Sequence, residues 1–307
     1  MLHRFIFCWC TCLRRRFGFT CTKRECNAIY AEHLRRLCRT AQRTLFNAKK
    51  SKCLCRHSIG TEKKTSRFTC SPSFYIGSNC IEFVDKWPHL GHIITNDCDD
   101  SEDITLKKTS LIGQVNKILC LFSNVKSRTK SKLVKSYCTS FYGAEIWDLS
   151  NNEIESICTA WRKGIRRIWQ VPNTTHSALI PGLCDTVPLV DLFYKRMLNF
   201  VYRCLRSVSP IVNFTVRHGM SFGLMDSTIG RNVLNCSLRY NTSIECINNL
   251  EFRSYSIDKC ASISKDNLDT VALLIELIQC RDGTLCLTDN NFSYSDTLTM
   301  IDMLCTL

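Results

Sequence analysis

The sequence predicts an α+β fold that is predominantly α, with a small β-hairpin region followed by helices as far as the C-terminus. Two observations lead to this prediction. The short apolar runs Phe74–Ile76 and Cys80–Val84 flank Gly77-Ser78-Asn79, which is typical of a β-hairpin. From about residue 104 onward, apolar residues recur every three or four positions, which is the spacing of amphipathic helices. The 307 residues are enough for two modest domains with their own cores.

The segments around the hairpin are assigned in the same way. Residues 26–45 are predicted to form an amphipathic helix, 46–57 a strand, 58–72 a polar loop and 90–95 another short strand. The acidic run over residues 97–103 was compared with a calcium-binding loop. Glu102 stands where that loop needs Gly, and Lys108 where it needs Glu. We therefore expect these carboxylates to precede a helix, where its dipole favours negative charge.

Three long helices are predicted next, over about residues 104–123, 129–148 and from Ser150 to just before Pro172. Ser150 with Glu153 three residues later is typical of a capping box. The apolar face of the third helix is predicted to consist of Ile154, Ile157, Cys158, Trp161, Ile165 and Ile168. Further helices are predicted over 176–183, 188–206, 267–280 and 296–305, whereas the pattern between 207 and 266 is indistinct.

The chain contains 22 cysteines, which fit either a secreted disulfide protein or an intracellular protein with buried thiols. Their spacing contains no CxxC pair, so a zinc site of the usual kind is not expected. We favour free thiols, with Cys120, Cys138 and Cys158 on apolar helix faces and the C-terminal cysteines buried. No apolar segment reaches the ~20 residues of a membrane span. These observations predict an intracellular protein, nuclear or cytoplasmic, that is not secreted and has no membrane partner.

The positive charge is concentrated in the first part of the chain. Residues 1–70 carry 17 Lys/Arg and 3 Asp/Glu, whereas residues 71–307 carry 24 of each. A second basic zone, residues 104–170, carries 12 basic and 4 acidic residues. This distribution suggests a polyanionic partner for the N-terminal half, and the alternative is a charged surface that only improves solubility.

Four segments, in the same order, resemble parts of LINE-type (non-LTR) retrotransposon reverse transcriptases. Phe46–Cys53 resembles the element that closes the palm, and Ile81–Gly91 resembles the hairpin that grips the primer end. Ser136–Leu149 is similar to the second thumb helix, and Ala160–His176 to the helix and turn that follow. The resemblance covers about residues 14–220.

The resemblance implies a domain order and two sets of site residues. It implies a degenerate palm remnant over 1–57, a loop and primer-grip-like hairpin over 58–103 and a thumb-like helical domain over 104–172. A helical connection over 173–220 and a C-terminal extension over 221–307 complete the expected organisation. The primer-grip-like residues would be Trp87, His89, Leu90 and Gly91. Lys50, or its neighbour Lys49, would be the palm lysine that protonates the leaving pyrophosphate.

The catalytic aspartates of the family have no counterpart at the expected place. Counting back from Phe46 puts Arg15 and Arg16 at the two Asp positions, and no Asp occurs in residues 1–84. A guanidinium group cannot bind the Mg²⁺ that intact members use. We therefore expect no metal site and no cofactor in this chain. The resemblance then implies a C-terminal fragment of an RNA-directed DNA polymerase that is inactive alone. Two alternatives are a domesticated RNA- or DNA-binding module and the non-functional product of a decayed element.

The expected partner is the backbone of a nucleic-acid duplex or an RNA–DNA hybrid, and the oligomeric state is left open. A thumb holds a duplex by its phosphates, which needs Lys and Arg on the surface of its helices. Residues 107–135 contain no Asp or Glu that would neutralise such a surface. The candidate contacts are Lys107, Lys108, Lys117, Lys126, Arg128, Lys130, Lys132, Lys135, Arg162, Lys163, Arg166 and Arg167.

Overall fold

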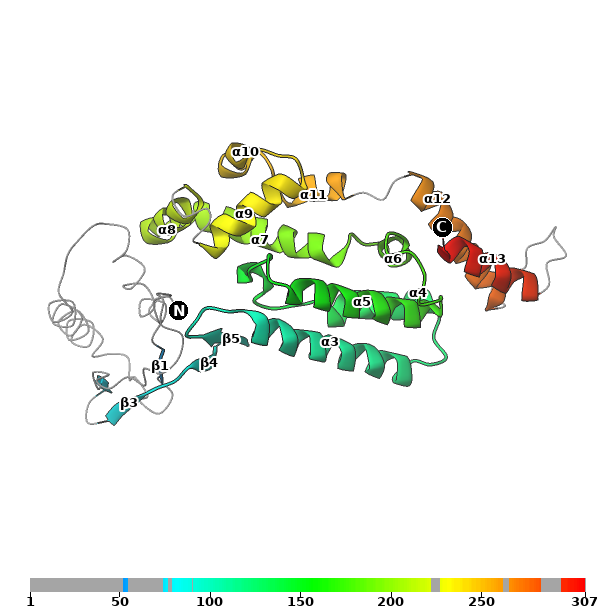
Figure 1. The fold of residues 1–307 in the computed structure, drawn as a ribbon, viewed down its shortest axis with the longest axis horizontal. Helices are drawn as coiled ribbons and strands as arrows, with labels where there is room; N and C mark the ends of the chain where they lie inside the picture. Colours follow the sequence, from blue (N-terminus) through cyan, green and yellow to red (C-terminus); the bar gives the residue numbers. More distant parts are fainter. Residues whose placement is uncertain are drawn as a thin grey trace. The chain divides into compact units, whose positions relative to one another are not determined.

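The computed structural model describes residues 52–54, 74–76, 79–89, 91–221, 227–261, 265–282 and 294–306. The chain divides into two compact units, residues 1–99 and 100–307, and each is described by itself. The described part of the first unit contains only strands and turns, and that of the second is helical (Figure 1). The prediction of an α+β fold that is predominantly α is confirmed at this level. None of the described helices is long and apolar enough to cross a membrane.

The first unit contains the predicted hairpin. β2 (Phe74–Ile76) pairs antiparallel with β3 (Asn79–Phe83), with Phe74 opposite Ile81, and β1 (Lys52–Cys53) pairs parallel with β3 on its other side. A second hairpin joins β4 (Lys86–His89) to β5 (His92–Thr95). Its turn uses Gly91 with φ 79°, a conformation that favours glycine. The sequence predicted β5 but not β4, which contains Pro88 and among the described strands pairs with β5 alone.

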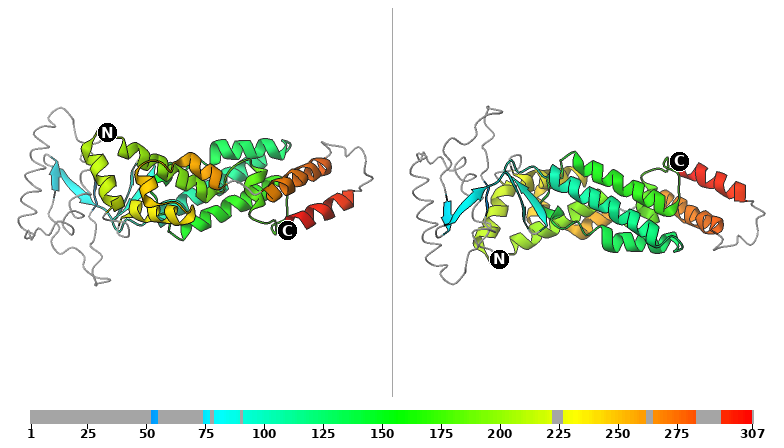
Figure 2. Two further views of the ribbon diagram at one scale, coloured as in Figure 1. Left: turned by 90° about the horizontal axis from the view of Figure 1, so that it is seen from above. Right: turned by 90° about the horizontal axis from the view of Figure 1, so that it is seen from below.

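The second unit begins with two helices that pack along one another, α3 (Ser101–Leu121) and α5 (Glu153–Trp169), as Figures 1 and 2 show. A Cβ atom on Gly164 of α5 would lie 3.3 Å from Cγ1 of Val115 on α3, so the close approach of the helices depends on this glycine. α4 (Ser127–Leu133) packs against both. The predicted apolar face of α5 is buried as expected: Ile154, Ile157, Cys158, Trp161, Ile165 and Ile168.

The predicted helix over 129–148 is wrong in its second half. α4 continues as a π-helical turn, Val134–Cys138, and regular helix stops there. Phe141 has φ 32° and Gly143 has φ 91°, and only a short 3-10 turn, Ala144–Ile146, follows. The segment Ser136–Leu149, which resembles a thumb helix, is therefore not one helix.

Burial of aromatic rings explains this chain reversal. The turn carries Trp147 and Phe141 into the core, where both pack against the Phe193 ring in T-shaped contacts at centroid distances of 5.3 and 5.4 Å. Arg196 donates hydrogen bonds to the carbonyl groups of residues 139–141, which lose their helical partners. Tertiary contacts thus replace the hydrogen bonds that a continuous helix would have made.

The ends of α3 and α5 differ slightly from the predicted ones. α3 begins at Ser101, so Glu102 and Asp103 lie in its first turn, where the helix dipole favours them. α5 begins after Asn152, and the predicted capping box at Ser150 is wrong: the Ser150 hydroxyl donates to Asp148 instead. α5 ends at Trp169 and is followed by the C-cap residue Gln170, which has φ 53°, so the helix stops before Pro172 as predicted.

Four of the remaining helices match predicted segments: α6 (Leu179–Leu183), α7 (Leu189–Leu205), α12 (Lys265–Arg281) and α13 (Tyr294–Thr306). Four others lie where the sequence pattern was indistinct: α8 (Pro210–Ser221), α9 (Thr228–Arg239), α10 (Ile244–Asn248) and α11 (Ser254–Cys260). α7 is central, because it packs against α5, α8, α9 and α11. α12 packs against α6 and α13.

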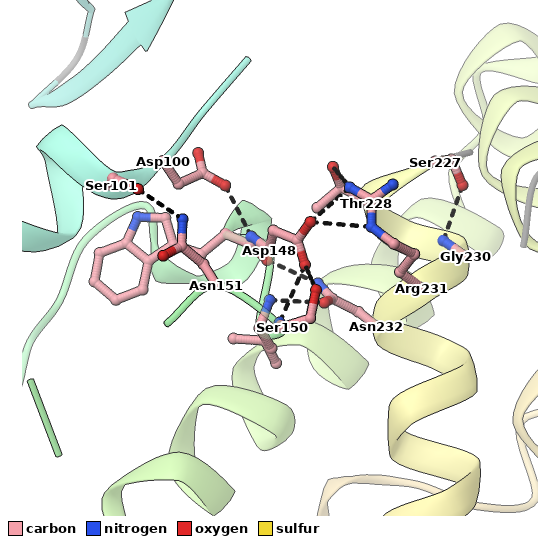
Figure 3. A network of polar contacts seen from close by, with 12 residues as sticks. Asp100, Ser101, Asp148, Ser150, Asn151, Ser227, Thr228, Gly230, Arg231 and Asn232 are labelled. Carbon is pink, nitrogen blue, oxygen red and sulfur yellow. Dashed lines mark hydrogen bonds and ion pairs between the residues drawn. The ribbon is translucent and has the colours of Figure 1, made fainter. Parts of the chain in front are cut away.

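A network of polar contacts ties the reversal to distant parts of the second unit (Figure 3). The indole Nε1 of Trp147 donates to Oδ2 of buried Asp103 at 2.8 Å. Asn232 of α9 donates to the Trp147 carbonyl at 2.7 Å and accepts from the Leu149 amide at 2.8 Å. Arg231 pairs with Asp148 at 2.5 Å. The predicted boundaries near residues 172 and 220 therefore fall inside one compact unit.

Twelve of the described cysteines are free thiols. Cys138 and Cys158 are buried as expected, but Cys120 is exposed and so does not lie on the apolar face of α3. In the C-terminal part, Cys236 and Cys305 are buried, whereas Cys260 is exposed. Burial raises the pKa of the Cys158 and Cys236 thiols to about 12, which keeps them protonated near neutral pH.

Candidate nucleic-acid interface

A groove of about 570 Å³ runs between α3 and α5, on the surface that the sequence predicted to bind nucleic acid. Its floor on α5 is formed by Ser156, Ala160 and Gly164, which are spaced four residues apart and so lie on one side of the helix. Their small side chains leave room beside α3. The α3 side carries Ile112 and Asn116, and cations from both helices line the groove.

The cations of the groove differ in how far they are neutralised. Lys163 is exposed and has no acidic partner among the described residues. Arg167 is also exposed, and its Nη1 donates to the neutral amide oxygen of Asn116 at 2.6 Å, which leaves its charge uncompensated. Lys108, in contrast, lies 3.1 Å from a carboxylate oxygen of Glu153 and donates to Ser156 at 2.8 Å. Lys163 and Arg167 are therefore the groove cations most available to an anion.

The groove is mixed in charge near the start of α5 and positive near its end. Glu155 lines the groove and pairs with Arg162, and Glu153 pairs with Lys108. Arg167 lies in the last turn of α5, where the helix dipole favours a cation. We therefore expect an anion to enter at the end formed by Lys163 and Arg167.

A second group of cations forms a stripe on α4 and the turn that follows it. Arg128, Lys132 and Lys135 are exposed and are spaced four and three residues apart, so they lie on one face. Lys135 donates to the Asp185 carbonyl at 2.8 Å, which orients it without neutralising it. Lys126, just before α4, is exposed as well. We call Arg128, Lys132 and Lys135 the α4 stripe.

Two of the predicted contacts are buried, and their expected position on the surface is wrong. Lys130 is 5 % exposed and donates to the Ser123 carbonyl at 2.8 Å. Arg166 is 8 % exposed and donates through Nε and Nη2 to the Thr175 carbonyl at 3.2 and 2.6 Å. Burial lowers the pKa of Arg166 from its usual value. Both side chains join the end of a helix to the loop beside it, so they stabilise the fold and cannot contact a phosphate at the surface.

The remaining predicted contacts are not gathered on the same face. Lys117 is exposed but stands nine residues after Lys108, which places it about 180° around α3 from the groove. Lys107 is half-buried on α3. The structure therefore brings together the groove cations and, separately, the α4 stripe.

The primer-grip-like residues lie in the first unit. Trp87 and His89 are on β4, Gly91 is in the turn to β5, and Leu90 lies outside the described residues. Lys52 on β1 pairs with Glu82, and its Nζ lies 5.7 Å from the centroid of the Trp87 ring. The predicted helix over 26–45 and the residues Arg15, Arg16, Lys49 and Lys50 also lie outside the described residues.

Across the described ranges, no group of three or more His, Cys, Asp or Glu side chains is placed to hold a metal ion. The sequence reasoning missed Asn116, which positions Arg167, and the groove floor. The signal for the floor was present as three small residues on α5 that are spaced four residues apart. Comparison of the chain with family models, curated proteins and solved structures gave no match, so the resemblance to LINE-type reverse transcriptases stays a sequence-based prediction.

Proposed function

We propose that the helical unit binds the phosphate backbone of a nucleic-acid duplex through the α4 stripe together with Lys163 and Arg167. The observation that supports this proposal is the set of exposed cations without an acidic partner in the described part of the chain. The three cations of the α4 stripe also lie in a segment, 107–135, that contains no acidic residue. Phosphate contacts of this kind do not read sequence. An RNA–DNA hybrid is the duplex favoured by the resemblance to reverse transcriptases.

The proposed function is binding without polymerisation. Phosphoryl transfer in the family depends on Mg²⁺ held by aspartates, and Arg15 and Arg16 stand at the corresponding positions of this sequence. We therefore expect the chain alone to extend no primer. A domesticated binding module is the version of this proposal in which binding itself is the function.

Salt-dependent binding of the full chain tests the proposal. The probe is a fluorescent RNA–DNA hybrid of about 20 base pairs, titrated at several salt concentrations by fluorescence anisotropy. The variant combines Arg128→Gln, Lys132→Gln and Lys163→Gln, which removes charge from exposed positions. The control combines Arg203→Gln and Arg217→Gln, which removes two exposed charges from α7 and α8.

Each lost phosphate contact lowers the slope of log K against log salt by about 0.9, so the triple variant is expected to lower it by about 2.7. The control is expected to leave the slope unchanged. The 17 basic residues of segment 1–70 contribute equally to all three proteins, so the difference between variants isolates the helical unit. An unchanged slope in the triple variant would show that binding, if present, resides elsewhere in the chain and would refute the proposal.

A further inference from the structure

A second cavity, of about 210 Å³, lies between α7 and the segment that connects α10 to α11. Its walls are apolar and include the buried side chains of Leu198 and Val201 on α7 and of Ile247 on α10. The half-buried ring of Phe252 also lines it and is held by the ring of Tyr240 at a centroid distance of 5.8 Å. This cavity is well below the ~300–1,000 Å³ of pockets for drug-sized ligands, so it suits one small ring system.

One side of the cavity carries an aromatic ring associated with two guanidinium groups. Tyr202 and Arg253 both line the cavity, and Cζ of Arg253 lies 4.8 Å from the centroid of the Tyr202 ring. Arg206 does not line the cavity itself, but its Cζ lies 5.3 Å from the same centroid and its side chain donates to the Tyr202 hydroxyl. Such distances are typical of cation–π contacts.

These two arginines keep their charge uncompensated. Nε of Arg253 donates to the Leu250 carbonyl at 2.7 Å, and Arg206 bonds to a phenol, so both partners are neutral. Neither arginine has an acidic partner among the described residues, and Glu251, the nearest acidic residue in sequence, does not line the cavity. Arginine presents a planar fork that matches the oxygens of a phosphate group.

A polar group also reaches the cavity. Asn199 of α7 lines it and is exposed, and its side-chain amide has no partner in the described part of the chain. A carboxamide offers one acceptor and two donor hydrogens in a plane, which is the arrangement that pairs with the edge of a nucleobase. The cavity thus combines apolar walls, an aromatic ring, a planar amide and unpaired cations.

We propose that this cavity binds a single nucleotide, with the base against Tyr202 and the apolar walls and the phosphate at Arg253 and Arg206. Bases stack on aromatic rings and guanidinium planes in proteins that hold unpaired nucleotides. The cavity belongs to α7, α10 and α11, whereas the cations of the duplex-binding surface proposed above belong to α4, the turn that follows it and α5. The two proposals therefore stand on different residues and can fail separately.

Titration of the full chain with 5′-adenosine monophosphate by isothermal calorimetry tests the inference, with adenosine, inorganic phosphate and phenyl phosphate as comparison probes. The variants are Arg253→Gln and Asn199→Leu, both at exposed positions, and the control is Arg217→Gln on α8. Circular dichroism checks that each variant folds like the parent. Because the basic segment 1–70 also attracts anions, only the difference between variant and control is used.

Adenosine monophosphate is expected to bind at least fivefold more tightly than adenosine, inorganic phosphate or phenyl phosphate. Arg253→Gln is expected to weaken it at least fivefold, and Asn199→Leu to remove its advantage over phenyl phosphate. Arg217→Gln should have no effect. If inorganic phosphate binds as tightly as adenosine monophosphate, binding is due to charge attraction alone. If phenyl phosphate binds the parent protein as tightly as adenosine monophosphate, the ligand is a phosphorylated aromatic side chain instead. Either result, or an equal loss in Arg253→Gln and Arg217→Gln, would overturn the inference.

Discussion

Replacing Arg196 by Met tests whether this side chain fixes the chain reversal that follows Cys138. The Arg196 guanidinium donates through Nη2 to the Thr139 carbonyl at 2.9 Å and through Nη1 to the Phe141 carbonyl at 3.0 Å, and it also bonds to the Ser140 carbonyl. Met keeps most of the apolar stem and removes every donor. The variant therefore isolates the hydrogen bonds from the packing of α7.

The expected loss follows from how buried the three carbonyl groups are. A hydrogen bond from a charged donor contributes about 1.5–3 kcal/mol when its partner cannot turn to water. Phe141 is buried and Thr139 half-buried, whereas Ser140 is exposed and can be rehydrated. Burial disfavours the guanidinium charge and lowers the pKa of Arg196, so it offsets part of the stabilisation that the hydrogen bonds supply. We expect Arg196→Met to lower the free energy of unfolding by about 2–4 kcal/mol.

Thermal unfolding followed by far-UV circular dichroism measures this loss. For a unit of about 200 residues, 1 kcal/mol shifts Tm by about 2–4 °C, so a fall of about 4–16 °C is expected. The matched control is Arg203→Met on the same helix, where the exposed side chain donates to the Asn199 carbonyl one turn earlier. If both variants shift Tm by the same amount, the reversal does not depend on Arg196 and our explanation of it fails.

Three further predictions concern packing, polar contacts and thiols in the same unit. Gly164→Ile should lower the free energy of unfolding by about 1–3 kcal/mol, because the new side chain forces Val115 away. Gly113→Ala adds a Cβ atom that meets nothing within 4 Å, so it should raise the free energy of unfolding by up to ~1 kcal/mol. Urea unfolding measures both changes. Asn232→Leu leaves the Trp147 carbonyl and the Leu149 amide unpaired, so it should lower the free energy of unfolding by about 2–4 kcal/mol in the same assay. A loss below 1 kcal/mol would contradict this. Burial raises the pKa of Cys158 to about 12, so the stability that its protonated thiol supplies is complete below pH ~8.5 and declines as pH rises toward 12. Cys158→Ala should make the alkaline fall in stability shallower between pH 9 and 11, as measured by urea unfolding at each pH, and an unchanged fall would refute this assignment.

Local signals predicted the elements that local interactions determine. The turn residues between Phe74–Ile76 and Cys80–Val84 predicted the β2–β3 hairpin, and Pro172 predicted the end of α5. The helix predicted over 129–148 failed because apolar residues at helical spacing also suit a chain that turns back into its own core. The burial of Trp147 against Phe193, which lies far along the sequence, decided between these outcomes.

Two of the helices between residues 207 and 266, α10 and α11, were missed for a different reason. α10 and α11 are short, with five and seven residues, so neither completes enough turns to produce a clear periodic pattern. The local signals in this region were serine caps at the starts of α10 and α9. Ser243 accepts from the Cys246 amide at 3.1 Å, and Ser227 accepts from the Gly230 amide at 2.9 Å at the start of α9. Serine three residues before an amide donor is a weak signal unless an apolar run follows it.

For the candidate interface, the sequence predicted which segment is basic but not which cations are free. Lys130 and Lys132 are two residues apart on one helix, so they point to nearly opposite sides, and the packing of α4 against α3 and α5 buries only the first. On α5, packing rather than spacing separates Arg166, which is buried against the Thr175 carbonyl, from exposed Lys163 and Arg167. Removing charge at Lys130 or Arg166 should therefore weaken binding only by destabilising the fold, whereas removal at Lys132 or Lys163 should change the salt dependence and leave Tm unaltered. Charge density along a sequence indicates a polyanion site only after the cations that satisfy buried carbonyl groups have been set aside.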